Sequence, residues 1–397
     1  MSGGTYVGAL LAACLLFGCG SSDDSGGGGG KSGTGGSAGV GGSGATGGSG
    51  GASGSAGAGA SGGSGGSSAA CTERATALGD ALESARVKEK SRDAALAVIS
   101  EDCGVQSFVR GDSNLTGAEL FRIGSVTKTY VASIVLGLVG AGKLSLDDKL
   151  DTWVTGVPNG NAITLRMLLN HTSGIFNYTS DASFLADLGK VWQPEELVAL
   201  ASAHGAVDPP GSVWKYSNTN YICLGIIAEK VGQKGIAEQI REKLLSPNQL
   251  AHTFLDGEEA LGDPLAPGFT QNGSDATNAI HPSGPWTAGA MTATTEDTAK
   301  WIRNLVTGKV LAAAQQTEME KGEPVASGVS YGLGLLMLDA ALSGGAGKGL
   351  GHDGSINGYH TQAFHFRESN TTIVSIVNQD GADPNTVMAA ALGVLFP

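Results

Sequence analysis

Apolar and polar positions divide the chain beyond residue 71 into three successive parts. In residues 72 to about 90, apolar side chains recur at helical spacing with charged residues between them, which predicts an amphipathic helix. Short apolar runs separated by Gly, Asp and Asn turns follow, and this pattern is typical of strands. The strands predicted here are residues 94–99, 105–110 and 119–123.

The middle part of the chain has a mainly helical pattern. An apolar stretch begins near Ser125, continues through Val139 and stops at the Gly-Ala-Gly of residues 140–142, so we expect one helix to span it. From about residue 143 to 320, helical patterns are joined by long loops. This part therefore predicts an all-helical region.

The last part returns to strands and ends in a helix over residues 385–395. The strand-like runs, separated by Gly or Asn turns, are residues 331–338, 349–355, 359–366 and 371–377. Strands at both ends with helices between them predict an α+β fold, in which a central antiparallel sheet is flanked by helices and carries an inserted all-helical domain. We assign residues 71–124 and about 325–397 to the sheet subdomain, and about 125–324 to the helical one.

The first residues of the chain have the pattern of an export signal. Residues 7–17 form an apolar run of signal-peptide length that is too short to span a bilayer. It leads into the Leu-Phe-Gly-Cys of residues 16–19, which resembles a bacterial lipobox. We expect residues 1–19 to be a signal peptide of lipoprotein type with Cys19 lipidated, and a plain secretory signal is the alternative. A second match, ending at Cys14, leaves too short an apolar core before it.

Composition changes sharply after this signal. Of the 50 residues from 21 to 70, 44 are Gly, Ser or Ala, and a tract with so few side chains to bury cannot offset its ordering entropy. We therefore expect residues 20–70 to be a disordered linker that tethers the body, residues 71–397. The expected location is export with a lipid anchor to the bacterial cell envelope, and otherwise the periplasm or the medium.

Charge and cysteine content narrow the class of protein. The net charge of −13 argues against a nucleic-acid partner, because phosphate contacts need clustered cations. No later apolar run reaches the length of a spanning helix, so we expect membrane contact only through the lipid. Cys71 and Cys103 can pair in an oxidising compartment, whereas Cys223 is expected to be a small buried hydrophobe. The seven His residues show no metal-ligand spacing, and we expect no metal and no other cofactor.

Ser125 and Lys128 are the sharpest candidates for chemistry. They are three positions apart on a predicted helix, so their side chains lie on one face. Ser125 falls in the first turn, where unpaired N–H groups favour a developing negative charge. A desolvated Lys amine can have its pKa lowered enough to accept the serine proton. About one Ser-x-x-Lys match is expected by chance in such a chain, so the pair alone is a weak signal.

A second segment adds Tyr216 and Asn218, which lie between a Pro-Pro-Gly loop and an apolar helix. Tyr216 can act as a phenolate-type base if a cationic Lys lies beside it. Asn218 can bind a substrate carbonyl or hold Lys128. The alternative is a half-buried Tyr and a helix-capping Asn.

A third segment is the Gly-His-Asp-Gly-Ser of residues 351–355, just before a predicted strand. Gly354 lets the backbone approach a ligand closely, and the Ser355 N–H can supply an oxyanion donor. A plain tight turn is the alternative.

These three elements, in this order and about 90 and 135 residues apart, resemble the serine β-lactamase and penicillin-recognising D,D-peptidase family. The similarity is to the branch of D-alanyl-D-alanine carboxypeptidases, D-aminopeptidases, class C β-lactamases and related esterases, and it extends from about residue 121 to 378. The framing segments that share it are residues 144–148, 163–174, 216–221, 288–291 and 331–335. The resemblance implies a β-lactamase/transpeptidase-like fold with the site at the junction of its two parts.

The resemblance also implies roles for the motif residues. Ser125 matches the acylated serine, Lys128 its partner, and Tyr216 the tyrosine that shuttles protons. Asn218 matches the contact to the substrate amide. His352 stands where better-known members have the Lys of Lys-Thr-Gly, and His-x-Gly is an accepted variant.

Other positions follow from the same resemblance. The amides of Ser125 and Ser355 match the oxyanion hole. His171 belongs to a segment that is structural in the family, a buried turn after a helix. Trp214 and Trp286 can wall the pocket, where Trp286 would contact substrate, or they can belong to the core.

Two features argue against a substrate with a free carboxylate. Residues 335–338 are Leu-Leu-Met-Leu, whereas members that read a terminal carboxylate can place an Arg there. Asp353 stands where Thr or Ser is usual, and its charge repels an anionic substrate end if it faces the pocket. Lys348 or Arg367 can compensate. We therefore expect esters, amides or free-amine substrates to be favoured over β-lactams.

The sequence thus predicts an exported serine hydrolase that forms an acyl-enzyme on Ser125. We expect a D-alanyl-D-alanine carboxypeptidase-like peptidase, or a related amidase or esterase, acting on small-molecule or peptide substrates. The alternatives are a β-lactamase and a slowly acylated penicillin-sensing or cell-wall-binding protein. A lipase-type hydrolase would need a Gly-x-Ser-x-Gly elbow, which the sequence lacks.

Overall fold

The computed structural model describes residues 69–397. The predicted signal peptide, the lipidation of Cys19 and all but the last two residues of the predicted linker lie outside the described residues. Within residues 69–397, none of the helices combines the length and the apolar character that crossing a membrane requires.

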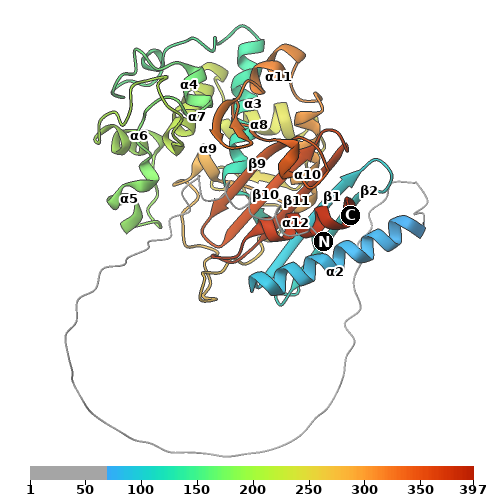
Figure 1. The fold of residues 1–397 in the computed structure, drawn as a ribbon. Helices are drawn as coiled ribbons and strands as arrows, with labels where there is room; N and C mark the ends of the chain where they lie inside the picture. The colour runs from blue at the N-terminus through green and yellow to red at the C-terminus, as the bar shows by residue number, and fades with distance from the viewer. Residues whose placement is uncertain (1–68) are drawn as a thin grey trace, which may run out of the picture.

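An eight-stranded antiparallel sheet, in the order β2-β1-β11-β10-β9-β8-β7-β6, forms the centre of the structure (Figure 1). Its strands are β1 (Asp93–Ser100), β2 (Gly104–Gly111), β6 (Glu323–Ala326), β7 (Val329–Tyr331), β8 (Leu336–Leu338), β9 (Gly349–Ile356), β10 (Tyr359–Phe366) and β11 (Thr371–Val377). The two chain ends meet where β1 pairs with β11, with Ala94 opposite Val377. The predicted α+β fold with a central antiparallel sheet is confirmed.

Helices cover both faces of this sheet. α2 (Ala69–Glu89) and α12 (Pro384–Leu395) pack together on one face, and α10 (Thr295–Val306) packs on the other (Figure 1). Alternate side chains of β1 enter two separate cores, with Ala97 in one and Leu96 in the other. Burial on both faces explains why this strand is a continuous apolar run without polar alternation.

The segment between β3 and α10 is mainly helical, as the pattern predicts. Its α-helices are α3 (Thr127–Gly140), α4 (Leu165–Leu169), α5 (Ala182–Ala186), α6 (Pro194–Ser202), α7 (Asn218–Gly232), α8 (Ile236–Ile240) and α9 (Trp286–Gly289). A further helix, α11 (Ala313–Met319), follows α10. α3 joins this part to the sheet layer, because the Tyr130 ring stacks on Trp301 of α10 with centroids 4.0 Å apart. The Trp301 indole N–H also donates to Thr129 Oγ1 at 2.7 Å.

Two predicted strands differ from the structure. The run at 119–123 forms only β3 (Phe121–Arg122), which lies in a separate three-stranded sheet with β5 (Met291–Ala293) and β4 (Thr253–Leu255). The run at 331–338 is not one strand, because the chain reverses between β7 and β8. Gly334 allows this turn with φ +75°, and a Cβ there would lie 2.5 Å from the Ala132 Cβ.

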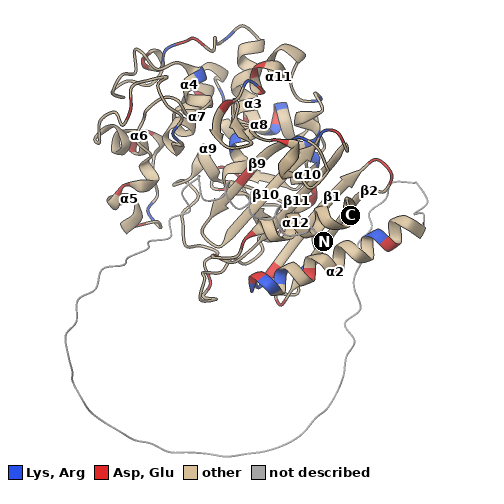
Figure 2. Cartoon of the chain, in the orientation of Figure 1, with Lys and Arg blue, Asp and Glu red and all other residues tan. Residues whose placement is uncertain are grey.

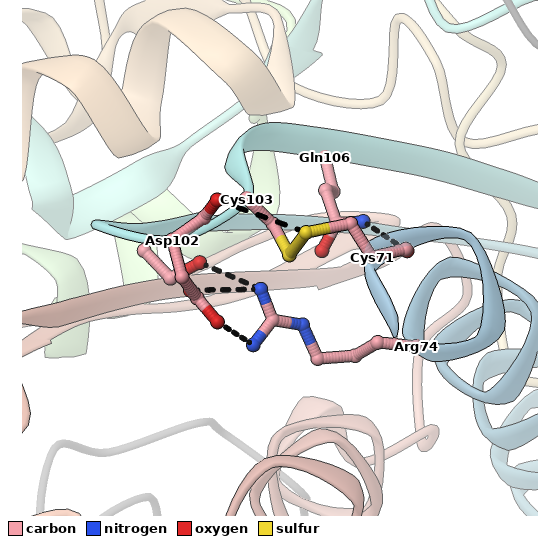
Figure 3. The surroundings of a disulfide bond; sticks show 6 residues. Cys71, Arg74, Asp102, Cys103 and Gln106 are labelled. Carbon is pink, nitrogen blue, oxygen red and sulfur yellow. Dashed lines mark hydrogen bonds and ion pairs between the residues drawn. A yellow bond between two sulfur atoms is a disulfide. The ribbon is translucent and has the colours of Figure 1, made fainter. Parts of the chain in front are cut away.

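The predicted disulfide between Cys71 and Cys103 is present and ties the first turn of α2 to the β1–β2 turn (Figure 3). Arg74 reinforces the same junction by donating from both terminal nitrogens to the Asp102 carboxylate at 2.8 and 2.9 Å. Gln106 Nε2 donates to the Cys71 carbonyl at 3.1 Å. The helix at the start of the described chain is therefore fixed covalently to the sheet.

Candidate active site

The turn that carries Ser125 is packed against β9. η1 (Gly124–Val126) is a short 3-10 turn that runs directly into α3. β8 pairs with β9 only at residues 349–351, and η1 lies where β9 has lost this neighbour. Gly354 makes the approach feasible, because a Cβ there would lie 2.0 Å from the Ile123 carbonyl oxygen. The close approach predicted for Gly354 is thus to the backbone before Ser125.

Lys128 is fully buried next to Ser125. Its Nζ lies 2.9 Å from Ser125 Oγ, 2.8 Å from Asn218 Oδ1 and 2.6 Å from the Ala288 carbonyl oxygen. Burial lowers the pKa of Lys128 well below its ordinary value, and the charge of Asp353 acts in the opposite direction. In the neutral amine, two N–H groups donate to Asn218 and Ala288 while the lone pair accepts from the Ser125 hydroxyl. This arrangement can take the proton of Ser125.

Tyr216 contacts the same hydroxyl. Its Oη donates to Ser125 Oγ at 2.8 Å, and Lys128 Nζ lies 4.9 Å from the centroid of its ring. Burial raises the pKa of Tyr216 well above its ordinary value, and this effect outweighs the hydrogen bond to Ser125. Tyr216 is therefore a neutral phenol here, not the phenolate considered from the sequence, and it can supply a proton.

Asn218 holds Lys128 and is not a helix cap. The N-cap of α7 is Ser217, which makes no side-chain capping bond, whereas Asn218 Oδ1 accepts from Lys128. The Asn218 backbone N–H donates to Asn177 Oδ1 at 3.0 Å, and Nδ2 donates to Thr179 Oγ1 at 3.3 Å. These bonds fix the amide so that its oxygen faces the amine.

His352 of β9 is fully buried with both ring nitrogens engaged. Nδ1 donates to the Asp353 carbonyl oxygen, since a carbonyl only accepts, and Nε2 lies 2.8 Å from the Tyr331 hydroxyl. A substrate contact through the His352 ring therefore requires one of these bonds to break. Sequence reasoning missed Tyr331, whose only signal was its place in a framing segment.

Asp353 brings a negative charge into this neighbourhood. Its Oδ1 is buried without a hydrogen-bond partner and lies 3.3 Å from His352 Nδ1. Apart from Asp353, strands β8 to β11 carry no charged residue (Figure 2). Among residues 69–397 no Lys or Arg pairs with it, and Arg367, one of the two cations considered for this role, bonds Glu320 at 2.6 Å. The charge of Asp353 is thus left to act on the site.

Two backbone amides border the gap between η1 and β9. A Cβ on Gly354 would lie 3.2 Å from Ser125 N, and a Cβ on Gly124 would lie 2.7 Å from Ser355 N. The amide of Ser125 and the amide of Ser355 therefore lie on the two facing sides of this gap, close to the turn that carries Ser125. Two such donors can bind the negative oxygen of a tetrahedral intermediate.

The other two aromatic candidates, Trp286 and His171, are both buried. Trp286 is 3% exposed, and its indole N–H donates to Glu258 at 2.8 Å, which favours the alternative of a core residue; its contact with substrate stays a prediction. His171 is buried and its Nδ1 accepts from the Ser217 N–H at 3.3 Å. Burial lowers the pKa of His171, and its ring packs 4.3 Å from that of Tyr216. His171 therefore supports the position of Tyr216.

A family model described as "Beta-lactamase" matches residues 80–395. The chain belongs to the beta-lactamase family. Its members include penicillin-binding proteins and amidohydrolases, and the protein is a serine hydrolase of this superfamily. The predicted family and fold are confirmed by this match.

The proteins that this beta-lactamase-family chain resembles have names that refer to different activities. Penicillin-binding protein 4* of Bacillus subtilis is 24% identical over 301 residues, which are 70% of this chain and 65% of the relative. Teichoic acid D-alanine hydrolase of Staphylococcus aureus is 26% identical over 175 residues, 44% and 42% of the two chains. A solved D-stereospecific amidohydrolase from Streptomyces sp. is 31% identical with a TM-score of 0.72, over 80% of this chain and 98% of that one. The match covers 65% of the length of the Bacillus subtilis protein and 42% of the length of the Staphylococcus aureus protein.

Proposed function

We propose that the protein hydrolyses amides or esters of D-amino acids that carry a free amine, through an acyl-enzyme on Ser125. The observation that carries this proposal is the joint contact of Lys128 Nζ and Tyr216 Oη with Ser125 Oγ, at 2.9 and 2.8 Å. A serine hydroxyl with a neutral amine on one side and a phenol on the other has both a base and an acid within hydrogen-bond reach.

Acylation begins when neutral Lys128 takes the Ser125 proton and Oγ attacks the substrate carbonyl carbon. The N–H groups of Ser125 and Ser355 bind the oxygen as it becomes negative. Tyr216 then gives its proton to the leaving nitrogen or oxygen as the bond to the carbonyl carbon breaks. The ammonium of Lys128 reprotonates Tyr216, so both groups return to their starting states.

Deacylation uses the same groups in the reverse order. Water attacks the carbonyl carbon of the acyl-enzyme and gives a proton to Lys128, directly or by way of Tyr216. The bond to Ser125 Oγ breaks, and Oγ recovers a proton from Lys128. The products are the free D-amino acid and the regenerated serine, with no cofactor needed for the balance.

The substrate class follows from charge around the acyl site. A substrate ammonium can pair with the buried Asp353 carboxylate, whose Oδ1 accepts no hydrogen bond, whereas a substrate carboxylate would meet repulsion there. Residues 335–338 supply no cation to offset that repulsion. The D configuration is suggested by the names of the Streptomyces amidohydrolase and the Staphylococcus hydrolase. These features favour an amidase or esterase over a carboxypeptidase or a β-lactamase.

We also propose that the enzyme is exported and anchored through a lipid on Cys19. The disulfide between Cys71 and Cys103 supports an oxidising compartment, because such bonds seldom persist in a reducing cytosol. Incorporation of labelled palmitate into the full chain, compared with the Cys19→Ala variant, tests the anchor. Equal labelling of both chains would refute it.

The direct test compares D-alanine p-nitroanilide, its N-acetyl derivative and a chromogenic cephalosporin as substrates of the wild type and of Ser125→Ala. We expect turnover of the free-amine anilide that is at least tenfold faster than that of the other two and is lost in Ser125→Ala. Acylation by the cephalosporin to one equivalent without turnover, and no anilide hydrolysis, would instead identify a slowly acylated penicillin-binding protein.

A further inference from the structure

The side chains of a second array of Ser, His and Asp adjoin the oxyanion amides and take no part in the proposed acyl transfer. Ser355 and His360 face each other directly across β9 and β10, and Ser355 Oγ lies 2.9 Å from His360 Nδ1. His360 Nε2 lies 3.3 Å from Oδ1 of Asp380, which follows β11. The three side chains form a continuous series from the edge of the site to the loop before α12.

Asp380 sets the direction of the hydrogen bonds in this series. Its Oδ1 also accepts from the Gly358 N–H at 2.8 Å. Burial raises the pKa of the Asp380 carboxyl, but the hydrogen bonds from His360 and Gly358 outweigh that effect and hold the pKa below its ordinary value. An ionised carboxylate only accepts, so Nε2 of His360 carries a proton, and in the neutral imidazole Nδ1 accepts from the Ser355 hydroxyl.

The Ser355 end of β9 has a strand neighbour only on the side of this array, while the turn η1 packs against its other edge. On one edge, β9 pairs with β8 only at residues 349–351, so the Ser355 end of β9 lacks a strand neighbour there. On the other edge, the turn at Gly358 packs so closely on the chain at Gly268 that a Cβ would lie 3.0 Å from the Gly268 carbonyl carbon. The distance between the Ser355 and Ser125 amides therefore depends on how firmly β9 is tied to β10.

We propose that His360 and Asp380 are positioning residues that act through the Ser355 hydroxyl to fix the Ser355 N–H as the second oxyanion donor. This role rests on the proposed function, because it presupposes an acyl transfer at Ser125. Loss of one oxyanion donor costs about 10² to 10³ in kcat, and a displacement of about 1 Å is enough to lose much of such an effect. The array contacts no reacting atom, so its removal lowers kcat and leaves KM nearly unchanged.

The test measures kcat and KM on a D-alanine ester and on the matching thionoester, in which sulfur replaces the carbonyl oxygen. Sulfur accepts N–H hydrogen bonds weakly, so the oxyanion amides contribute little to the thionoester reaction. We expect His360→Ala to lower kcat on the ester about tenfold, with little change on the thionoester. His360→Asn, whose Oδ1 can accept from Ser355 in place of Nδ1, restores most of the loss.

A matched control is available on the same strand. His365 of β10 is buried, and its Nδ1 lies 2.9 Å from Thr372 Oγ1, so His365→Ala also removes a bonded imidazole but lies away from Ser355. We expect His365→Ala to lower thermal stability and to leave the ratio of ester to thionoester rates at the wild-type value.

Four outcomes overturn one or both proposals. Equal losses on ester and thionoester in His360→Ala, or rates equal to those of the wild type, would refute the positioning role alone. A fluorophosphonate adduct on Ser355 of the Ser125→Ala variant would also refute it, because the array would then activate a nucleophile. Absence of Ser125-dependent turnover in the wild type would refute the proposed function and this role with it.

Discussion

Lys128 Nζ lies 2.9 Å from Ser125 Oγ at the end of a side chain that is entirely buried. This combination matters because an ammonium so far from water is costly, and the neutral amine is the form that can accept a proton. Two of its partners, Asn218 Oδ1 and the Ala288 carbonyl oxygen, leave the lone pair of the neutral form directed at the serine. Burial thus makes Lys128 a base for the neighbouring nucleophile, Ser125.

The pH dependence of kcat/KM reports this base. Because burial lowers the pKa of Lys128 and the neutral form is active, kcat/KM should rise with pH through the lowered pKa and level off well below pH 10. The charge of Asp353 raises the pKa of Lys128, so Asp353→Asn should move the rise to lower pH. Rate profiles of the two proteins check this, and an unchanged or upward shift would contradict the electrostatic account.

Tyr216→Phe keeps the buried ring and removes the hydroxyl that donates to Ser125. If Tyr216 protonates the leaving group, the substitution should lower kcat/KM more for an anilide than for an activated p-nitrophenyl ester, because the leaving group of the ester needs no proton. We expect kcat/KM on the anilide to fall about 10² to 10⁴-fold, the usual range for loss of an acid–base group. Similar losses on both substrates would assign Tyr216 to serine activation alone.

Asp353→Asn tests how the site selects substrates. Removing the charge should lower kcat/KM for D-alanine p-nitroanilide about tenfold, equivalent to about 1.4 kcal/mol, and should raise it for an analogue bearing a carboxylate. Asp339→Asn, a substitution of the same type just after β8, serves as the control and should change neither. Equal effects of Asp353→Asn on cationic and anionic substrates would show that the Asp353 carboxylate does not discriminate between substrates by their charge.

Loss of the disulfide should affect stability far more than catalysis. The Cys71–Cys103 bond joins residues separated by 32 positions, and the chain-entropy model gives a stabilisation of about 3 to 4 kcal/mol for such a loop. Cys71→Ser/Cys103→Ser should therefore unfold at a lower temperature, with kcat/KM unchanged at 25 °C. Thermal melts with and without dithiothreitol check this, because the reductant should shift the melting temperature of the wild type only.

The parts of the site that share one local segment were predictable from the sequence. Ser125 and Lys128 meet because three positions on a helix share a face, and the structure brings them within hydrogen-bond distance. Tyr216 and Asn218 could be singled out by residue type, and both contact this pair. The central sheet followed from strands at both chain ends.

Other parts depend on contacts that no local pattern encodes. The Ala288 carbonyl that bonds Lys128 is a backbone group 160 positions away, and its residue type carries no signal. Trp286 was a pocket candidate by its aromatic character, yet its indole N–H is satisfied by Glu258, which is a tertiary contact. The split between β7 and β8 depends on the turn at Gly334, which an apolar run conceals.

Acylation of Ser125 can be observed by mass spectrometry of the intact protein and its peptides. The protein is mixed with a D-alanine p-nitrophenyl ester or a fluorophosphonate, quenched in acid and digested. We expect one covalent adduct, on the peptide that contains Ser125, and none in Ser125→Ala. An adduct confined to another residue, or undiminished ester turnover by Ser125→Ala, would contradict it.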